Sequence, residues 1–138
     1  MKGMATSILA LVVLIALVPG AQAAEHCNAA TVKGHYGFTF SGFVLDVNGN
    51  NLPFAGTGVS TNDGEGNSSA TVNGSFNGSF QSFPYTGTYV VNPDCSGSLT
   101  STNGNANFLL VVVNGGKEIL GMATDPGDTW TIDLKRID

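Results

Sequence analysis

Residues 83–94 read FPYTGTYVVNPD, an alternating run that ends in a turn. One parity carries aromatic residues, glycine and valine, among them Tyr85 and Tyr89, whereas threonine recurs on the other parity. A period of two predicts a strand that has one face on a core. Asn92-Pro93-Asp94 supplies the residues of a turn. We therefore expect a strand over residues 83–91, with Tyr85 and Tyr89 pointing inward.

Similar runs recur along the chain between turns rich in glycine, asparagine and aspartate, and no segment has the period of an amphipathic helix. The expected strands are residues 34–45, 53–61, 68–80, 83–91, 95–102, 108–113, 117–124 and 129–135. Short connections favour pairing between strands that follow one another. A meander that closes on itself removes both sheet edges. We predict an all-β fold, an eight-stranded antiparallel up-and-down barrel, with a two-sheet β-sandwich as the alternative.

Four local expectations follow from the pattern within these runs. Phe43 breaks the alternation of the first strand after Gly42, which predicts a bulge or sharp bend at that glycine. Residues 73–80 repeat NGSF twice, which we interpret as one strand bent at its glycines. Residues 108–113 are apolar on both faces, so their outer face should be covered. The segment 27–34 is expected to form a short helical turn that plugs one end of the barrel.

Residues 1–23 have the organisation of an export signal peptide. Lys2 gives a charged start, and the apolar run 8–18 is shorter than the ~20 residues that span a bilayer. Ala21 and Ala23 fit the small-residue pattern of a cleavage site. Cleavage after Ala23 leaves residues 24–138 as a single domain, exported to the periplasm or to the outside of the cell.

The charge of the chain argues against two classes of partner. It carries 5 basic and 10 acidic side chains, a net charge of −5 at pH 7. Nucleic acids and anionic membranes attract clusters of lysine and arginine, which this composition does not supply. We expect neither nucleic acid nor, after cleavage of the signal peptide, a membrane as partner. The oligomeric state stays open.

Cys27 and Cys95 are the two cysteines of the chain. An even number of cysteines in an exported protein indicates a disulfide, and two thiols allow one intramolecular pairing. Their spacing lacks the C-x-x-C pattern of redox and zinc sites. We predict a Cys27–Cys95 disulfide.

Residues 46–50, DVNGN, have the D-x-N-x-N spacing of a calcium-binding loop. Such loops place glycine at position six and glutamate at position twelve, where this chain has Asn51 and Thr57. The segment is therefore interpreted as a turn, and no metal site and no cofactor are predicted.

Catalytic residues are not indicated either. His26 and His35 have no nucleophile or carboxylate placed beside them by the pattern. Asp63 and Glu65 flank a glycine in a turn, where carboxylates are usually solvated. An enzyme is therefore the least favoured of the functions considered.

Glu118 is the carboxylate with two possible environments. If it shares the inner face with Leu120 and Met122, it lies among tyrosines and Trp130, and burial would raise its pKa. The opposite parity places Ile119 inside and leaves Glu118 solvated beside Lys117, and the pattern favours this second arrangement. The candidate ligand-binding residues are Tyr36, Tyr85, Tyr89, Glu118 and Trp130.

Three strings carry a resemblance: HYGFTFSG (35–42), YTGTYVVNPDCSG (85–97) and GGKEILGMATDPG (115–127). They resemble a group of small secreted bacterial proteins of unassigned function, whose chains begin with a cysteine before a G-x-Y-G-F strand. That group is similar to the barrel of allene oxide cyclases and dirigent proteins. The resemblance implies a bacterial, calycin-like barrel over most of residues 24–138. It implies no cyclase activity, because no catalytic residue of the plant enzymes has a counterpart here.

The expected function is non-covalent binding of a small, partly apolar molecule. Eight strands enclose room for packed side chains or for one small ligand, and the inner faces are rich in aromatic residues. The many glycines favour a void, whereas the bulky aromatic rings favour a packed interior. The alternative function is a structural or surface-interaction domain without a ligand.

Overall fold

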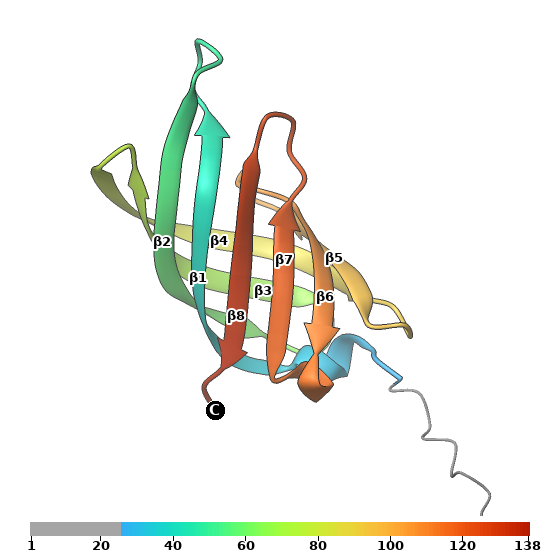
Figure 1. Cartoon of the computed structure of the whole chain (residues 1–138). Coiled ribbons are helices and arrows are strands. Elements are labelled where there is room, and N and C mark those ends of the chain that lie inside the picture. Colours follow the sequence, from blue (N-terminus) through green and yellow to red (C-terminus); the bar gives the residue numbers. More distant parts are fainter. Residues whose placement is uncertain (1–25) are drawn as a thin grey trace, which may run out of the picture.

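The computed structural model describes residues 26–138, so the predicted signal peptide at 1–23 lies outside the described residues (Figure 1). The elements, in chain order, are η1 (Ala29–Val32), β1 (Gly34–Leu45), β2 (Asn51–Asn62), β3 (Asn67–Phe76), β4 (Ser79–Val91), β5 (Ser96–Ser101), β6 (Phe108–Val113), η2 (Asn114–Gly116), β7 (Glu118–Ala123) and β8 (Thr129–Arg136). Both η elements are short 3-10 helices.

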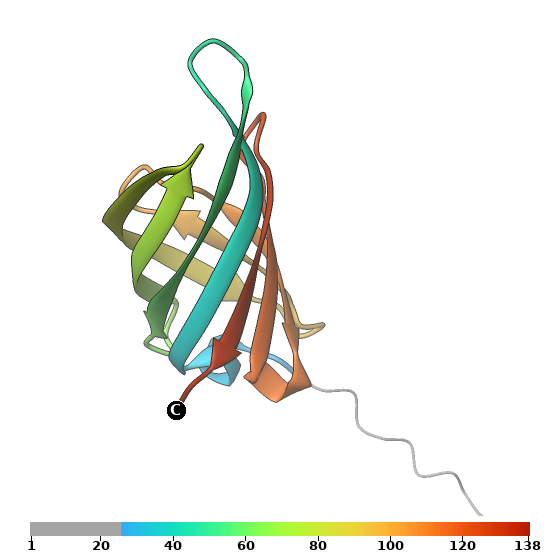
Figure 2. The same ribbon diagram turned by 60° about the vertical axis from the view of Figure 1, so that its left-hand side comes forward.

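The eight strands form one closed antiparallel barrel in the order of the chain. Pairing of β1 with β8 closes it, in a register that runs from Tyr36 opposite Arg136 to Phe43 opposite Thr129. This confirms the predicted barrel and excludes the β-sandwich. Figure 2 shows the β1–β2 hairpin projecting beyond the other strands.

The connections alternate between two ends of the barrel. We call one the mouth end; it carries the loops 46–50, 77–78, 102–107 and 124–128. We call the other the plug end; η1, η2 and the C-terminus lie there, at the bottom of Figure 1.

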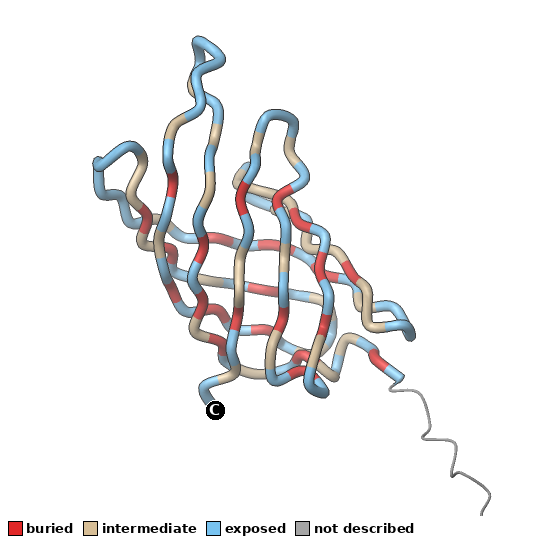
Figure 3. Tube along the Cα trace, viewed as in Figure 1, coloured by how far each residue is buried: buried red, intermediate tan, exposed pale blue. Residues whose placement is uncertain are grey.

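Burial alternates along the strands, as Figure 3 shows. On β1 the inward side chains are Tyr36, Phe38 and Phe40, and on β8 they include Trp130 and Leu134. Tyr85 and Tyr89 are buried on β4, as the period of two predicts. The inward face predicted for β4 is therefore confirmed, and β1 and β8 show the same alternation.

Glycines on β2 make room for the phenylalanine rings of β1. Gly58 pairs with Phe38 and Gly56 pairs with Phe40. A Cβ at Gly58 would collide with the Phe38 ring and with the carbonyl oxygen of Thr71. The rings of β1 therefore lie over bare backbone, which is how a narrow barrel accommodates them.

The two NGSF repeats have different structures, contrary to the prediction of one strand over 68–80. The first, residues 73–76, ends β3, whereas Asn77 and Gly78 form the turn to β4. Both turn residues have positive φ, 48° and 85°, as the tight Asn-Gly hairpin requires. The repeated NGSF sequence therefore consists of the end of one strand followed by a hairpin turn into the next strand.

Gly42 causes no bulge, so one of the two alternatives expected at this glycine was wrong. The β1 register to both β2 and β8 is continuous through Gly42, which faces Trp130. A Cβ at Gly42 would collide with the Trp130 backbone and Cβ. Alternation is kept: Gly42 has the inward position beside Trp130, and Phe43 points outward and is half exposed.

The outer face of β6 is exposed, although we expected it to be covered. Leu109 is 56% exposed and Val111 is 50% exposed, next to Met122 and Leu120 on β7. The inward side chains of β6, Phe108, Leu110 and Val112, are buried. The run is thus apolar on both faces, but only one face is in the core.

The segment before β1 plugs the barrel, as predicted. Asn28 caps η1 by accepting hydrogen bonds from the backbone of Ala30 and Thr31, and the Thr31 hydroxyl accepts one from the Asn28 N–H. The cap orients Val32, whose side chain is buried at the plug end.

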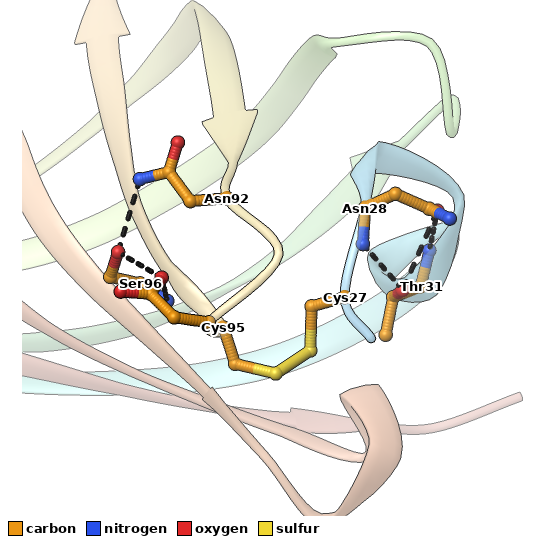
Figure 4. Close-up of a disulfide and its surroundings, with 7 residues drawn as sticks. Cys27, Asn28, Thr31, Asn92, Cys95 and Ser96 are labelled. Atoms are coloured by element: carbon orange, nitrogen blue, oxygen red, sulfur yellow. Dashed lines mark hydrogen bonds between the residues drawn. A yellow bond between two sulfur atoms is a disulfide. The ribbon is translucent and has the colours of Figure 1, made fainter. Parts of the chain in front are cut away.

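The predicted Cys27–Cys95 disulfide is present and fixes this plug to the β4–β5 turn (Figure 4). The Cα atoms are 5.0 Å apart, although the cysteines are 68 positions apart in sequence. Cys95 has a φ of 69° at the turn position where glycine is usual. The Cys27 backbone N–H also donates to the Pro93 carbonyl at 3.3 Å.

Neither of the two short helices described within residues 26–138 has the length or the apolar character of a membrane span.

Candidate ligand-binding cavity

A cavity of about 380 Å³ occupies the barrel interior toward the mouth end. Its walls are mainly aromatic and aliphatic side chains, including Phe38, Phe40, Phe54, Val72, Phe108 and Trp130. Ligand sites in proteins typically have volumes of about 300–1,000 Å³ and predominantly apolar walls. The cavity therefore has the size and lining of a site for one small molecule.

Small inward residues on β2 and β3 leave this space unfilled. Ser60 on β2 pairs with Ala70 on β3, and Ala70 pairs with Tyr85 on β4. All three line the cavity. Because a serine and an alanine stand where other strands carry aromatic rings, the opposite side chains cannot fill the interior.

Trp130 organises the aromatic wall. Its ring centroid lies 5.1 Å from that of Phe54 and 5.0 Å from that of Phe108, in edge-to-face geometry in both cases. Its Nε1–H donates to Asp128 Oδ2 at 3.1 Å. The indole is thus held by packing on one side and by a carboxylate at the mouth on the other.

Tyr85 connects the cavity wall to the β5–β6 loop. Its hydroxyl donates to the Ala106 carbonyl at 3.0 Å. Burial raises the pKa of Tyr85 well above the ordinary value, and the nearby Asp125 carboxylate adds to the increase. The phenol therefore stays protonated and keeps the loop against the barrel.

The Asp125 carboxylate joins the two loops that flank the mouth. It accepts hydrogen bonds from the backbone N–H and the Nδ2 of Asn107, each at 2.8 Å. Asp125, Asp128 and Asn105 all contribute to the cavity lining. The rim is therefore built from acidic and amide groups in fixed positions.

Deep in the cavity, the Ser60 hydroxyl has no hydrogen-bond partner within the described residues. Ser60 is 4% exposed and lines the cavity. A buried hydroxyl without a partner costs on the order of 1–3 kcal/mol. The cavity therefore offers an unpartnered hydroxyl at depth to whatever occupies it.

Two of the predicted ligand residues hold the plug instead. The Tyr36 hydroxyl donates to the Gly116 carbonyl and accepts from Arg136 Nη2 at 2.8 Å. The Tyr89 hydroxyl donates to the Ala29 carbonyl at 3.1 Å and accepts from the Gly64 N–H at 2.9 Å. Burial raises the pKa of both tyrosines.

Neither tyrosine lines the 380 Å³ cavity; Tyr89 borders a separate void of about 40 Å³ near the plug. Side chains that include Phe108, Ile132 and Leu134 border both spaces and separate them. Of the five predicted ligand residues, the structure brings only Tyr85 and Trp130 to the main cavity.

Glu118 lies outside both spaces, at the start of β7 on the plug end. Ile119 and Ala123 face inward and are buried, which leaves Glu118 partly exposed. Its carboxylate accepts a hydrogen bond from Asn114 Nδ2 at 3.3 Å. The parity that the sequence favoured is therefore correct, and the placement of Glu118 among the tyrosines is wrong.

The carboxylates of the two acidic turns, at Asp46 and Asp63, accept hydrogen bonds from residues of their own turns. Asp46 Oδ1 accepts from the backbone N–H groups of Asn48 and Asn50, and Asp63 Oδ1 accepts from those of Glu65 and Asn67, all at 2.8–2.9 Å. Hydrogen bonds from Asn50 and Asn67, respectively, lower the pKa of these two carboxyl groups. Within residues 26–138, no three histidine, cysteine or acidic side chains are grouped so that they could hold a metal ion.

Sequence reasoning did not identify Ser60, Ala70 or the rim residues Asp125 and Asp128 as part of the site. The parity of β2 contained a signal for Ser60, because it continues the inward series of Phe54, Gly56 and Gly58. The loop carboxylates had no comparable signal, since alternation says nothing about loops.

The fold alone does not identify a function, because one barrel architecture serves many. The resemblance to the barrel of allene oxide cyclases and dirigent proteins stays a prediction. No family model, no curated protein and no solved structure matches this chain.

Proposed function

We propose that this protein is an exported binding protein that holds one small, partly apolar molecule inside its barrel. The observation that carries the proposal is the 380 Å³ cavity, whose walls are aromatic and aliphatic. A structural barrel of this size would fill the space with side chains, because protein interiors are normally close-packed.

Two features support a location outside the cytoplasm. The Cys27–Cys95 disulfide is typical of oxidising compartments. Residues 1–23 have the pattern of a cleaved signal peptide. Together they favour an extracytoplasmic carrier or scavenger of a small molecule.

Fluorescence of the single tryptophan tests the proposal directly. Trp130 is the one tryptophan of the chain and lines the cavity, so an occupant should change its emission. We expect the neutral aromatic probe 1-aminoanthracene to bind the exported protein at micromolar concentration and to quench or shift that emission.

A matched pair of variants locates the binding. Ala70→Leu adds a side chain into the cavity, whereas Thr71→Leu adds the same side chain to the exposed face of the same strand. Ala70→Leu should weaken probe binding by about tenfold or more, which corresponds to ~1.4 kcal/mol, and Thr71→Leu should leave it unchanged. Equal binding by the two variants would show that the probe lies elsewhere.

The alternative function, a surface-interaction domain, is favoured by one observation. Leu109, Val111, Leu120 and Met122 form an exposed apolar patch on the outer face of β6 and β7. Failure of apolar probes to affect Trp130 would overturn the cavity proposal and leave this patch as the better indication of function.

A further inference from the structure

The rim of the cavity carries negative charge without a positive partner. Asp125 and Asp128 line the cavity from the β7–β8 loop. Their hydrogen bonds come from Asn107 and Trp130, which are neutral donors. Within residues 26–138, the one ion pair joins Lys135 and Asp133 on the outer wall, so neither rim carboxylate is neutralised by a cation.

The basic side chains of the described residues all lie toward the opposite end. Lys33 precedes β1, Lys117 follows η2, and Lys135 and Arg136 end β8, so each belongs to the plug end. The mouth end carries Asp46 on the β1–β2 loop in addition to Asp125 and Asp128. Among residues 26–138 the mouth end therefore has acidic side chains and neither lysine nor arginine, so its entrance is negative, whereas the plug end carries both basic residues and acidic ones such as Asp63, Glu65 and Asp94.

An apolar cavity strengthens the effect of such a rim. Low-dielectric walls focus the field of the carboxylates at the entrance, which favours cations and repels anions. The aromatic ring of Trp130 beside Asp128 adds a surface on which a cationic group is also favoured.

A second, independent feature indicates that the space receives a ligand. The Ser60 hydroxyl is buried to 4% exposure, lines the cavity and lacks a partner among the described residues. It gives an entering molecule a hydrogen-bonding contact far from the charged rim, inside mainly apolar walls.

We infer that the ligand is a cationic amphiphile, with an apolar body in the barrel and an amine or quaternary ammonium group at the rim. The inference rests on the proposed binding function and defines its ligand class. Fatty acids and other anionic amphiphiles of the same size are selected against by the same carboxylates.

Three decyl compounds separate this inference from the proposed function itself. Decyltrimethylammonium, decanol and decanoate share one apolar chain and differ in head-group charge. Each is titrated below its micelle concentration into the exported protein, with Trp130 emission and calorimetry as readouts. At low ionic strength we expect the cation to bind at least about tenfold more tightly than decanoate, with decanol between them. The difference in affinity between the cation and decanoate should decrease as salt is added, because salt screens the charges of the solvent-accessible rim.

Charge variants identify the cause of the preference. Asp128→Asn keeps an oxygen for the Trp130 N–H and removes one rim charge, so it should reduce the preference for the cation over decanoate by about threefold or more. Glu65→Gln removes one charge from the exposed β2–β3 loop at the plug end and should leave the preference unchanged.

The outcomes are distinct. If decanol and the cation bind but decanoate binds equally well, the inference is wrong and the binding function stands. If none of the three compounds binds, the binding function and the inference both fail.

Discussion

Trp130→Ala measures how much of the barrel depends on its aromatic wall. Trp130 is 7% exposed and contacts the rings of Phe40, Phe54 and Phe108 at centroid distances of 5.5, 5.1 and 5.0 Å. Replacing a buried tryptophan with alanine costs about 3–5 kcal/mol, and edge-to-face pairs contribute about 0.5–1.5 kcal/mol each within that total. We expect the loss to be about 3–5 kcal/mol in the free energy of unfolding.

Trp130→Phe divides this loss into its parts. Phenylalanine keeps an aromatic ring against Phe54 and Phe108 but cannot donate to Asp128, so we expect a smaller loss of about 1–2 kcal/mol. Urea unfolding followed by circular dichroism at neutral pH gives both values, provided that the m-value is unchanged. A loss below about 1 kcal/mol for Trp130→Ala would refute the assignment of Trp130 to the structural wall of the cavity.

Two further predictions concern the plug end and the tyrosines. Replacing both Cys27 and Cys95 with serine should lower the free energy of unfolding by about 2–4 kcal/mol, because the bond closes a span of 68 positions; two free thiols in the exported protein would contradict this. Burial raises the pKa of all three tyrosines, Tyr36, Tyr85 and Tyr89, above the ordinary value of 10.0. Their stabilising effect is therefore complete below pH 10 and is lost as the pH rises through the folded-state pKa, so tyrosinate absorbance should develop only together with alkaline unfolding. Absorbance that rises with an ordinary midpoint near pH 10 while the circular dichroism is still native would show that the phenols are accessible.

Alternation in the sequence was sufficient to predict the barrel and the faces of several strands. The period of two on β1, β4 and β8 places Phe38, Tyr85 and Trp130 inside, and the structure agrees. The prediction of one strand over 68–80 failed because its two NGSF segments have different tertiary neighbours. Gly74 lies under the rings of Phe54 and Phe40, whereas Gly78 has nothing near it and forms the turn. Tertiary contacts keep the first NGSF segment in a strand. The local sequence pattern holds no information about these contacts.

The candidate site was predictable only in its aromatic part. The alternation of large apolar residues such as Trp130 with polar ones indicates that the large residues lie inside. A cavity, in contrast, forms where the inward residues are small, such as Ser60 and Ala70, and the pattern of large residues does not reveal it. The plug explains the displacement of Tyr36 and Tyr89. Both face inward, but their height along the barrel puts them at the plug end, where the Tyr36 hydroxyl donates to the Gly116 carbonyl of η2 and the Tyr89 hydroxyl donates to the Ala29 carbonyl of η1.

The two ends of this barrel have separate physical tasks. At the plug end, the disulfide, the Tyr89 contact with Ala29 and the Arg136 contact with Thr31 tie η1 to strands distant in sequence. Those contacts stabilise the closed ring without entering the 380 Å³ cavity. At the mouth end, Asp125 and Tyr85 fix the β5–β6 loop beside the opening without filling it. Because the rigid contacts lie around the void and not across it, a ligand of the proposed kind would enter from the mouth while the plug stays closed. The proposed binding would therefore not compete with the interactions that keep the barrel folded, which is the usual conflict between stability and function.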